Sequence, residues 1–363
     1  MKTLIPLERR LSPERFETPA ILKKLNTASR QLAELKGIVA SIPNQAILID
    51  TLGLQEAKDS SEIENIITTH NDLFQQAVFP QFSGNPAAKE VACYREALWA
   101  GFQRVSDSKL LTSKHILTIQ AELEKNHAGF RKLPGTELRN NAGATIYIPP
   151  TPEVVPQLMT DLERFINDDQ LFVADPLVKM ALIHHQFESI HPFYDGNGRC
   201  GRIINVLYLV QQDLLNIPVL YLSRFIVQHK GEYYRLLQDV RDADSWENWV
   251  MYMMDAVEQT ALETVASIQA IKNLLFRVKH AIRKKYRFYS QDLINNLFRH
   301  PYTRIEFIMQ DMGVSRLTAT NYLNQLTAGG FLQKRKLGRN NYYINMPLCR
   351  ILADNDEWPA YNE

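Results

Sequence analysis

The chain has 363 residues, of which 45% are apolar and 22% charged, with a formal net charge of +1. This composition is that of a folded protein long enough for two or three domains, and it excludes a small disulfide-stabilised scaffold. Apolar runs such as 203–210 are far shorter than the roughly 20 residues of a membrane-spanning helix, so no membrane segment is expected. Arginines interrupt the N-terminus, and the three isolated cysteines suit neither a zinc site nor a disulfide framework, which favours a cytoplasmic protein with reduced thiols.

Helical patterns follow one another along the first 190 residues. Apolar residues at helical spacing predict helices at 21–39, 54–74, 87–104, 113–127, 152–167 and 176–190. Within the second of these, Asp59 or Ser60 is the expected N-cap, and Ser61 with Glu64 has the spacing of a capping box. The stretch LRNNAGATIYIPP joins turn residues to β-favouring ones and predicts a small hairpin at 139–148. Further helices are predicted at 201–215, 230–241 and 245–282, so the body is mainly α.

The segment HPFYDGNGRCGR at 191–202 has the composition of an anion-binding turn. Its proline ends the preceding helix, because proline lacks the amide hydrogen and forces the residue before it out of the helical conformation. Gly196 and Gly198 then permit a tight turn that leaves backbone N–H groups open to a ligand, at the N-terminus of the next helix. Arg199 and Arg202 share a face of that helix and suit phosphate groups. A nucleotide triphosphate fits these features best.

A histidine and a carboxylate lie in the same segment. His191 has an ordinary pKa of about 6.5 and can accept a proton at neutral pH, while Asp195 is a ligand of the kind that holds Mg²⁺ on phosphates. Together they indicate phosphoryl or nucleotidyl transfer. The glycine spacing also fits a dinucleotide-binding fingerprint, but that motif follows a β-strand, whereas a helix precedes it here. A zinc cluster of His185, Glu188 and His191 is disfavoured, because the spacing is not that of a zinc motif.

The C-terminal part of the chain differs in charge. Residues 277–350 contain 14 Lys and Arg and three acidic residues, a formal charge of +11, whereas 1–276 contain 27 basic and 33 acidic residues, a charge of −6. The pattern of helix, helix, turn, helix and hairpin over 286–350 resembles a winged helix-turn-helix, in which 315–327 would enter a major groove. Such domains bind nucleic acid or serve as protein-docking and dimerisation surfaces; the sequence favours protein recognition or dimerisation, and DNA is the less favoured alternative.

The whole of 191–202 resembles the signature of the Fic domain family, HPFx[D/E]GNGRxxR, with every specified position filled. The similarity extends over 90–255. It implies a mainly α fold, with a Fic-type helical core and a small β-hairpin flap, joined here to the C-terminal winged helix. Most enzymes of this family are protein adenylyltransferases, which transfer AMP from ATP to a hydroxyl side chain of Tyr, Ser or Thr. A kinase branch typically has Lys where this chain has Gly198, so the glycine favours nucleotidyl transfer.

The resemblance also assigns roles to individual residues. His191 is the expected general base for the target hydroxyl. Asp195 would hold Mg²⁺. The two arginines would bind the β and γ phosphates of ATP, and Asn197 would lie at the α phosphate. The expected ATP-binding residues are Gly196, Asn197, Gly198, Arg199, Cys200, Gly201 and Arg202, with Tyr233 and Tyr234 matching a tyrosine pair near the nucleotide base. Helical tyrosines are as often core residues as ligands.

Two regulatory and docking elements are implied as well. The hairpin corresponds to the family's flap, whose residues Ala144, Thr145, Ile146 and Tyr147 would pair with the main chain of a protein target. The stretch SSEIEN matches the family's regulatory motif, [S/T]xxxE[G/N], with Ser60, Glu64 and Asn65 at the specified positions. Because the motif precedes the core, it is expected on an N-terminal inhibitory helix, from which Glu64 reaches Arg202 and keeps ATP unproductive. The same glutamate is expected to position water for the removal of AMP.

These predictions divide the chain into four parts. Residues 1–85 are an N-terminal helical region with the inhibitory motif, 86–255 the Fic core, 256–285 a connecting helix and 286–363 the winged-helix domain. The predicted function is an autoinhibited, Mg²⁺-dependent protein adenylyltransferase that modifies a target protein or itself. The alternative is a DNA-binding regulator whose core senses nucleotide without transferring it, and the presence of His191 with all its partners favours the enzyme. DNA and a second copy of the chain remain open as further partners.

Overall fold

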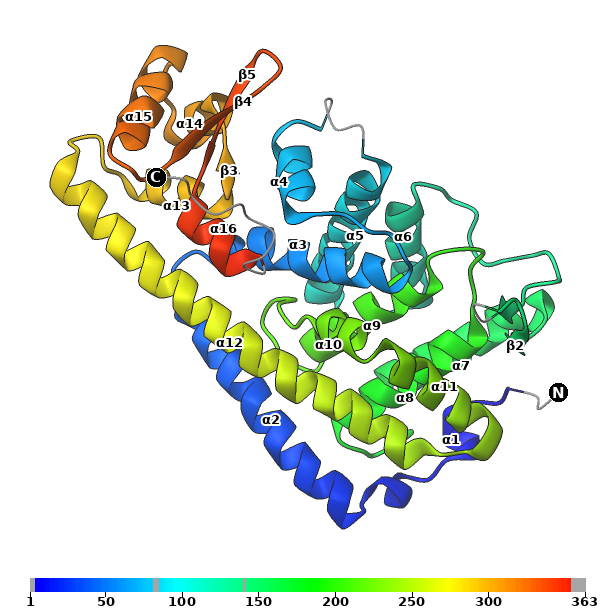
Figure 1. The fold of residues 1–363 in the computed structure, drawn as a ribbon. Coiled ribbons are helices and arrows are strands. Elements are labelled where there is room, and N and C mark those ends of the chain that lie inside the picture. The colour runs from blue at the N-terminus through cyan, green and yellow to red at the C-terminus, as the bar shows by residue number, and fades with distance from the viewer. Residues whose placement is uncertain (1–3, 81–84, 140–141, 354–363) are drawn as a thin grey trace. The chain divides into compact units, whose positions relative to one another are not determined.

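Figure 1 shows the computed structural model of the chain, which describes residues 4–80, 85–139 and 142–353. The fold is mainly α, as predicted, and the described strands form small antiparallel sheets. The chain divides into two compact units: unit 1 comprises 1–36, 59–66 and 93–262, and unit 2 comprises 37–58, 67–92 and 263–363. None of the described helices combines the length and apolar character needed to cross a membrane. The four domain limits predicted from the sequence remain predictions.

Unit 1 is built around two buried helices, α8 (Pro176–Ile190) and α9 (Asn197–Gln211). Because α8 is buried from Leu177 to its end and α9 over most of its length, both helices lie inside the core. They pack against each other, while α7 contacts α8 and α6 contacts α9. The surrounding elements are α1 (Leu7–Arg10), η1 (Pro13–Phe16), α5 (Pro86–Ser108), α6 (Ser113–Glu124), η2 (Pro152–Val154), α7 (Val155–Asn167), α10 (Leu222–Gln228) and α11 (Lys230–Ala243). The long helices α2 (Pro19–Ala40) and α12 (Trp246–Lys285) have residues in both units, and the first turns of α5, up to residue 92, belong to unit 2.

The ends of α8 follow from the local sequence. Asp175 caps the N-terminus by accepting a hydrogen bond of 2.8 Å from the N–H of Leu177, and Pro176 occupies the first helical position, where an N–H would have no helical partner. At the other end His191 adopts the left-handed conformation, with φ of 50°, and its N–H bonds to the carbonyl of Phe187 at 2.9 Å. His191 therefore stands where the chain leaves a core helix.

The regulatory motif lies at the end of a helix, and the start signal predicted there is wrong. Helix α3 runs over Ala46–Ile63, because the apolar residues upstream of Asp59 already continue a helical pattern. Asn65 takes a left-handed conformation with φ of 64°. Its N–H bonds to the carbonyl of Glu62, and the N–H of Ile66 bonds to the carbonyl of Ser61, both at 3.0 Å. These two bonds form a Schellman C-cap, in which Asn or Gly is the favoured residue.

The predicted hairpin is present in unit 1. Strand β1 (Leu138–Arg139) pairs antiparallel with β2 (Thr145–Tyr147), so that Leu138 lies opposite Tyr147 and Arg139 opposite Thr145. Ala144 precedes β2 outside the regular pairing. Two of the residues assigned to the hairpin, at 140–141, lie outside the described part of the chain.

Unit 2 contains a three-stranded antiparallel sheet with strand order β3-β5-β4. Its core contains apolar residues of the helices that flank the sheet, including Leu293, Leu297, Ile308 and Leu323. Over 286–350 the structure has the predicted helix, helix, turn, helix and hairpin, with a short strand that was not predicted, β3, between the first two helices. The elements are α4 (His70–Val78), α13 (Gln291–Arg299), β3 (Tyr302–Thr303), α14 (Ile305–Met312), α15 (Arg316–Ala328), β4 (Gln333–Leu337), β5 (Asn340–Ile344) and α16 (Met346–Leu352).

Candidate active site

A tight turn joins α8 to α9. Gly196, with φ of 78°, immediately precedes α9 in a conformation that favours glycine. Asn197 fixes the turn, because its Oδ1 accepts a hydrogen bond from the N–H of Phe193 at 2.9 Å and its Nδ2 donates to the carbonyl of Phe193 at 3.0 Å. Phe193 is itself buried, with its ring centroid 5.6 Å from that of Phe130. The side chain of Asn197 therefore shapes the turn, a role that the sequence did not predict for it.

Arg131 also fixes the same turn, through hydrogen bonds to backbone carbonyl groups. It is buried, and its Nε donates to the carbonyl of His191 at 2.8 Å, while Nη2 donates to the carbonyls of Ile190 and Pro150. Its backbone N–H bonds to the carbonyl of Pro192 at 2.9 Å. A buried guanidinium with several carbonyl partners fixes the backbone that carries the histidine. Arg131 could not be predicted from the sequence, because a single arginine outside any motif gives no signal.

The environment of His191 makes it a neutral base. Burial, with a contribution from nearby Arg131 and Arg241, lowers the pKa of His191 to about 4. The imidazole is therefore uncharged at pH 7, which is the form that accepts a proton. Its buried Nδ1 has no hydrogen-bond partner among the described residues. A half-buried histidine whose ring is not fully engaged suits a reactive role better than a structural one.

The predicted contact between the regulatory motif and Arg202 is present. Arg202 is buried; its Nε donates to Oγ of Ser60, and its Nη2 donates to the carbonyl of Ser60 and to Oε1 of Glu64, each at 2.8 Å. Burial opposes the ionisation of Glu64, but the charge of Arg202 outweighs it and holds the pKa of Glu64 below its usual value. Arg202 is therefore bound by both Ser60 and Glu64 of the motif.

The second arginine of the turn has its own carboxylate partner. Nη2 of Arg199 lies 2.9 Å from Oε1 of Glu124, the last residue of α6, and both side chains are largely buried. Asp195 is more distant, with its Oδ1 3.8 Å from the same nitrogen. Glu124 could not be identified from the sequence, since only the tertiary packing of α6 on α9 brings it to the turn. Each predicted phosphate-binding arginine is thus ion-paired to a glutamate from another helix or its end.

Two glycines of the turn lie against these carboxylates. A Cβ atom added at Gly196 would lie 2.6 Å from Oε1 of Glu124, and one at Gly198 would contact Oε1 of Glu64 and lie 3.0 Å from Nη1 of Arg202. A side chain at either position would therefore displace an ion pair. The two carboxylates lie at the N-terminus of α9, where the backbone and the arginines would otherwise attract an anion.

A second buried carboxylate lies where α8 and α9 approach each other. Gly201 permits the approach, because a Cβ there would lie 2.6 Å from Oε1 of Glu188. Burial raises the pKa of Glu188 to about 7. Nearby, Nε2 of His184 lies 2.8 Å from the hydroxyl of Tyr233, and its Nδ1 lies 3.1 Å from the side-chain nitrogen of Asn205. Burial lowers the pKa of His184 to about 3, so this histidine is a neutral part of the core.

The other residues predicted for the nucleotide differ in exposure. Tyr233 is buried and bonded to His184, whereas Tyr234 is 41% exposed. Cys200 is buried within α9. Asp195 is exposed at the turn, and its Oδ1 accepts a hydrogen bond from the N–H of Gly196 at 2.7 Å. Tyr234 and Asp195 are therefore open to a ligand, while the side chains of Tyr233 and Cys200 are not.

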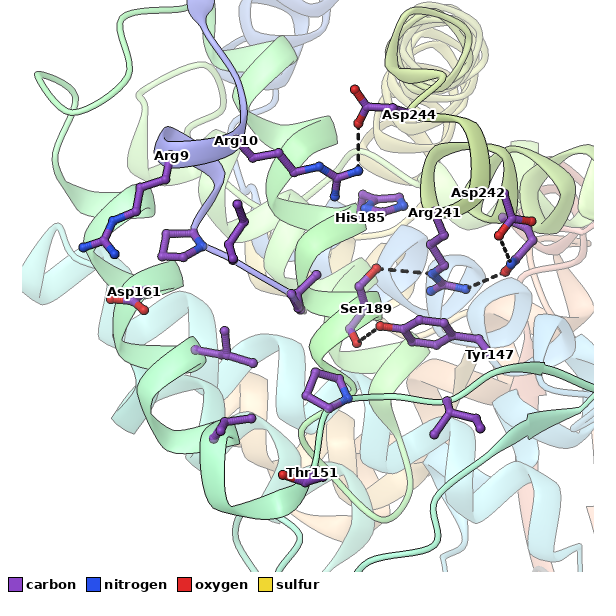
Figure 2. Close-up of a pocket in the computed structure, with 18 of the residues that line it drawn as sticks. Arg9, Arg10, Tyr147, Thr151, Asp161, His185, Ser189, Arg241, Asp242 and Asp244 are labelled. Carbon is purple, nitrogen blue, oxygen red and sulfur yellow. Dashed lines mark hydrogen bonds and ion pairs between the residues drawn. The ribbon is translucent and has the colours of Figure 1, made fainter. Parts of the chain in front are cut away.

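The flap borders a pocket of about 1280 Å³ in unit 1, shown in Figure 2. Its lining includes β2, the N-terminal segment at 4–10, α7, α8 and α11. In Figure 2 the guanidinium of Arg241 lies over the ring of Tyr147, with its carbon 4.0 Å from the ring centroid. Both residues bond to Ser189: the Tyr147 hydroxyl donates to its carbonyl at 2.8 Å, and Arg241 Nε donates to its Oγ at 3.3 Å. The pocket therefore reaches the end of α8, two residues before His191.

These features define a helical protein with a glycine-rich turn, two buried arginines that follow it and a neutral histidine beside it. Comparison with known protein families identifies the relatives of this chain. Residues 110–209 match the Fic/DOC family, 22–103 match the N-terminal region of the Fic/DOC family, and 274–348 match the C-terminal domain of SoFic-like protein adenylyltransferases. The chain belongs to the Fic/DOC family.

Solved structures share the fold of this chain, and curated proteins match part of its sequence. A Fic family protein from Desulfovibrio desulfuricans aligns with a TM-score of 0.59 at 21% identity, covering 92% of this chain and 98% of its own. Fic-1 from C. elegans aligns with a TM-score of 0.54 at 18% identity, covering 69% and 74%. Protein adenylyltransferase Fic from Aedes aegypti is 31% identical over 114 residues, and a probable protein adenylyltransferase from Aquifex aeolicus is 38% identical over 80. These matches cover 31% and 22% of this chain but only 21% and 24% of the two relatives.

Proposed function

We propose that this chain is a protein adenylyltransferase, which transfers AMP from ATP to the hydroxyl of a tyrosine, serine or threonine in a target protein or in the chain itself. The observation that carries the proposal is the neutral His191 at the end of α8, beside a turn whose backbone, with Arg199 and Arg202, suits a chain of phosphates. Curated relatives named protein adenylyltransferases support the same chemistry.

In this reaction His191 accepts the proton of the target hydroxyl. The hydroxyl oxygen forms a bond to the α-phosphorus of ATP while the bond to pyrophosphate breaks, so that the target gains an AMP ester and pyrophosphate leaves. The N-terminus of α9 would stabilise the negative charge on the transferred group. Arg199 and Arg202 would bind the β and γ phosphates in place of Glu124 and Glu64.

Asp195 is the residue that would hold Mg²⁺. Its carboxylate is exposed at the turn that would carry the phosphates, and Mg²⁺ in proteins is commonly bound by one or two carboxylates together with phosphate oxygens. The donor set therefore fits the ion. Mg²⁺ would neutralise charge on the departing pyrophosphate.

Glu64 would act as an inhibitor of the same site. Its carboxylate is ion-paired with Arg202, so the γ phosphate of ATP would have to displace this carboxylate to reach the guanidinium. ATP that does not displace it would bind without the productive geometry. The same carboxylate, close to the turn, would orient water for the reverse removal of AMP. A comparison of AMP release from a modified target by the wild type and by Glu64→Gly tests this second role, because only the wild type is expected to release it.

A protein target would dock at the flap. Strand β2 has one edge paired with β1, and pairing of a target segment with the other edge would bring a hydroxyl toward His191. The neighbouring pocket offers exposed apolar side chains, including Ile146 and Ile148, for the side chains of that segment. The reaction would take place in the cytosol, where ATP is available and the three cysteines stay reduced.

Incorporation of label from ATP tests the proposal. Label at the α phosphate should enter protein with Glu64→Gly, and His191→Ala in the same background should abolish it, because no base remains for the hydroxyl. Label at the γ phosphate is the control, since a kinase would transfer it and an adenylyltransferase would not. If the wild type and Glu64→Gly both leave lysate proteins unlabelled, the proposal is wrong, and a nucleotide-sensing regulator becomes the better description.

A further inference from the structure

The basic C-terminal segment, 277–350, contributes no residue to the AMP transfer proposed above. We propose that α14, α15 and the β4–β5 hairpin form a winged helix that binds double-stranded DNA, with α15 in the major groove and the hairpin on the phosphate backbone. The chain would then hold its nucleotidyl-transfer core on DNA. The proposal concerns unit 2 alone and does not depend on the activity of the core.

The connection between α14 and α15 is of the kind found in a helix-turn-helix. Helix α14 ends at Met312, and its C-cap Gly313 adopts the left-handed conformation with φ of 63°. Ser315 then caps α15, because its Oγ accepts a hydrogen bond from the N–H of Thr318. The connection is three residues long and contains the glycine that such turns favour. Helix α15 has 13 residues, which gives it a length of about 20 Å and the diameter that a major groove accepts.

The outer face of α15 carries groups that read base edges. Its exposed residues Leu317, Asn321 and Asn324 recur at helical spacing, so they form one stripe. Asparagine amides pair with adenine in the major groove, and an apolar side chain contacts the thymine methyl group. Leu317 is 82% exposed. The Leu317 side chain is therefore open to contact with such a methyl group.

The hairpin places positive charge beside this stripe. Lys334 Nζ lies 3.3 Å from Oδ1 of Asn324, so β4 and the stripe of α15 adjoin. Because side chains alternate along a strand, Lys336 shares the face of Lys334. Arg339 lies at the tip with Gly338, whose φ is 58°. All three basic side chains are exposed, and no carboxylate partner is found for them among the described residues.

Charge and composition favour DNA over a protein partner for this surface. Among the described residues of 286–353, Leu317 is the exposed large apolar side chain, which is too little apolar area for the centre of a stable protein interface. Three exposed cations next to polar amides instead match the phosphates and base edges of a duplex. The near-neutral charge of the whole chain does not oppose this, because 277–350 have a formal charge of +11.

Fluorescence anisotropy of a labelled 30-base-pair duplex with the full-length chain tests the proposal. Three phosphate contacts give a slope of about −2.7 for log affinity against log salt, so affinity should fall about 40-fold between 50 and 200 mM salt. The double variant Lys336→Ala/Arg339→Ala should reduce the fall to about 4-fold. The matched control, Lys23→Ala/Lys114→Ala, removes the same charge from exposed lysines of unit 1 and should behave as the wild type.

Selection from a random duplex pool tests base reading separately. The wild type should enrich a preferred sequence, and Asn321→Ala should weaken binding to it by about 5-fold or more without changing the salt slope. Absence of binding at 50 mM salt with protein at about 100 μM overturns the proposal. So does a control variant whose salt dependence is reduced as much as that of the double variant. A concentration-dependent dimer that Leu317→Asp abolishes, with no duplex binding, would show instead that the surface joins two copies of the chain.

Discussion

Release of Arg202 from the regulatory motif is the most direct test of the proposed inhibition. Glu64→Gly removes the carboxylate that lies 2.8 Å from Nη2 of Arg202 and leaves the two bonds to Ser60 in place. A hydrogen bond to a charged group contributes about 1.5–3 kcal/mol. Because the Glu64 side chain is 34% exposed, we take the lower end, about 1.5 kcal/mol, which corresponds to about a tenfold change.

The assay is the initial rate of AMP incorporation at ATP concentrations below KM, which reports binding and productive geometry together. Glu64→Gly should raise this rate about tenfold or more. Glu62→Gly is the matched control, since it places glycine in the same helical turn while the bonds from Arg202 to Ser60 and Glu64 remain. A thermal denaturation scan of each variant separates a change in the site from a loss of fold.

Equal rates for the wild type, Glu64→Gly and Glu62→Gly, with all three folded, would refute the reasoning. Such a result would mean that the ion pair stabilises the apo site without competing with ATP. Glu64→Gln gives an intermediate case, because its amide oxygen can still accept from Arg202 but carries no charge, so its rate should lie between those of the wild type and Glu64→Gly.

Three further outcomes are expected. The pKa of His191 is lowered to about 4, so the AMP-transfer rate should not decline as pH falls from 8 to 6. The neutral form of His191 also contributes to the stability of the fold. Urea unfolding should show this contribution in full above pH 6.5 and its loss as pH falls toward 4. Arg131→Leu should lower kcat about 5- to 150-fold with little change in the KM for ATP, because it releases the carbonyl that carries His191; an unchanged kcat contradicts its positioning role. Asn65→Gly should leave the melting temperature nearly unchanged, whereas Asn65→Val should destabilise the chain by about 1–2 kcal/mol, and equal values for the two would contradict the left-handed cap.

The mainly α fold was predicted from the sequence because it depends on local patterns. The prediction of an anion site also rests on a local pattern, since the glycines, the proline and the two arginines that indicate it lie within twelve residues. The contact of Glu64 with Arg202 was also predicted, although only through resemblance to a family. Helix boundaries were harder to predict. The stretch at Ser60 has the spacing of a helix start, but in the structure it forms a helix end, because Asn65 supplies a left-handed cap.

Residues that act on the turn from distant elements were not predictable. Glu124 comes from α6 and Arg131 from a connecting segment, and their roles arise only when these elements pack against α8 and α9. Asn197 shows a related limit, since its identity indicated a ligand contact while its amide bonds to the backbone of Phe193. A motif identifies the residues that a site needs, but it does not distinguish those that bind from those that hold the turn in shape.

The left-handed cap at Asn65 has a consequence for how this protein would vary by mutation. The residue next to Glu64 determines the path of the chain out of α3, so the inhibitory carboxylate depends on a neighbour that never contacts Arg202 in the described bonds. Only residues that tolerate this backbone conformation preserve the path. A genetic selection for unrestrained activity should therefore recover β-branched substitutions at position 65 as well as changes at Glu64, and natural variation at position 65 should be confined to asparagine and glycine.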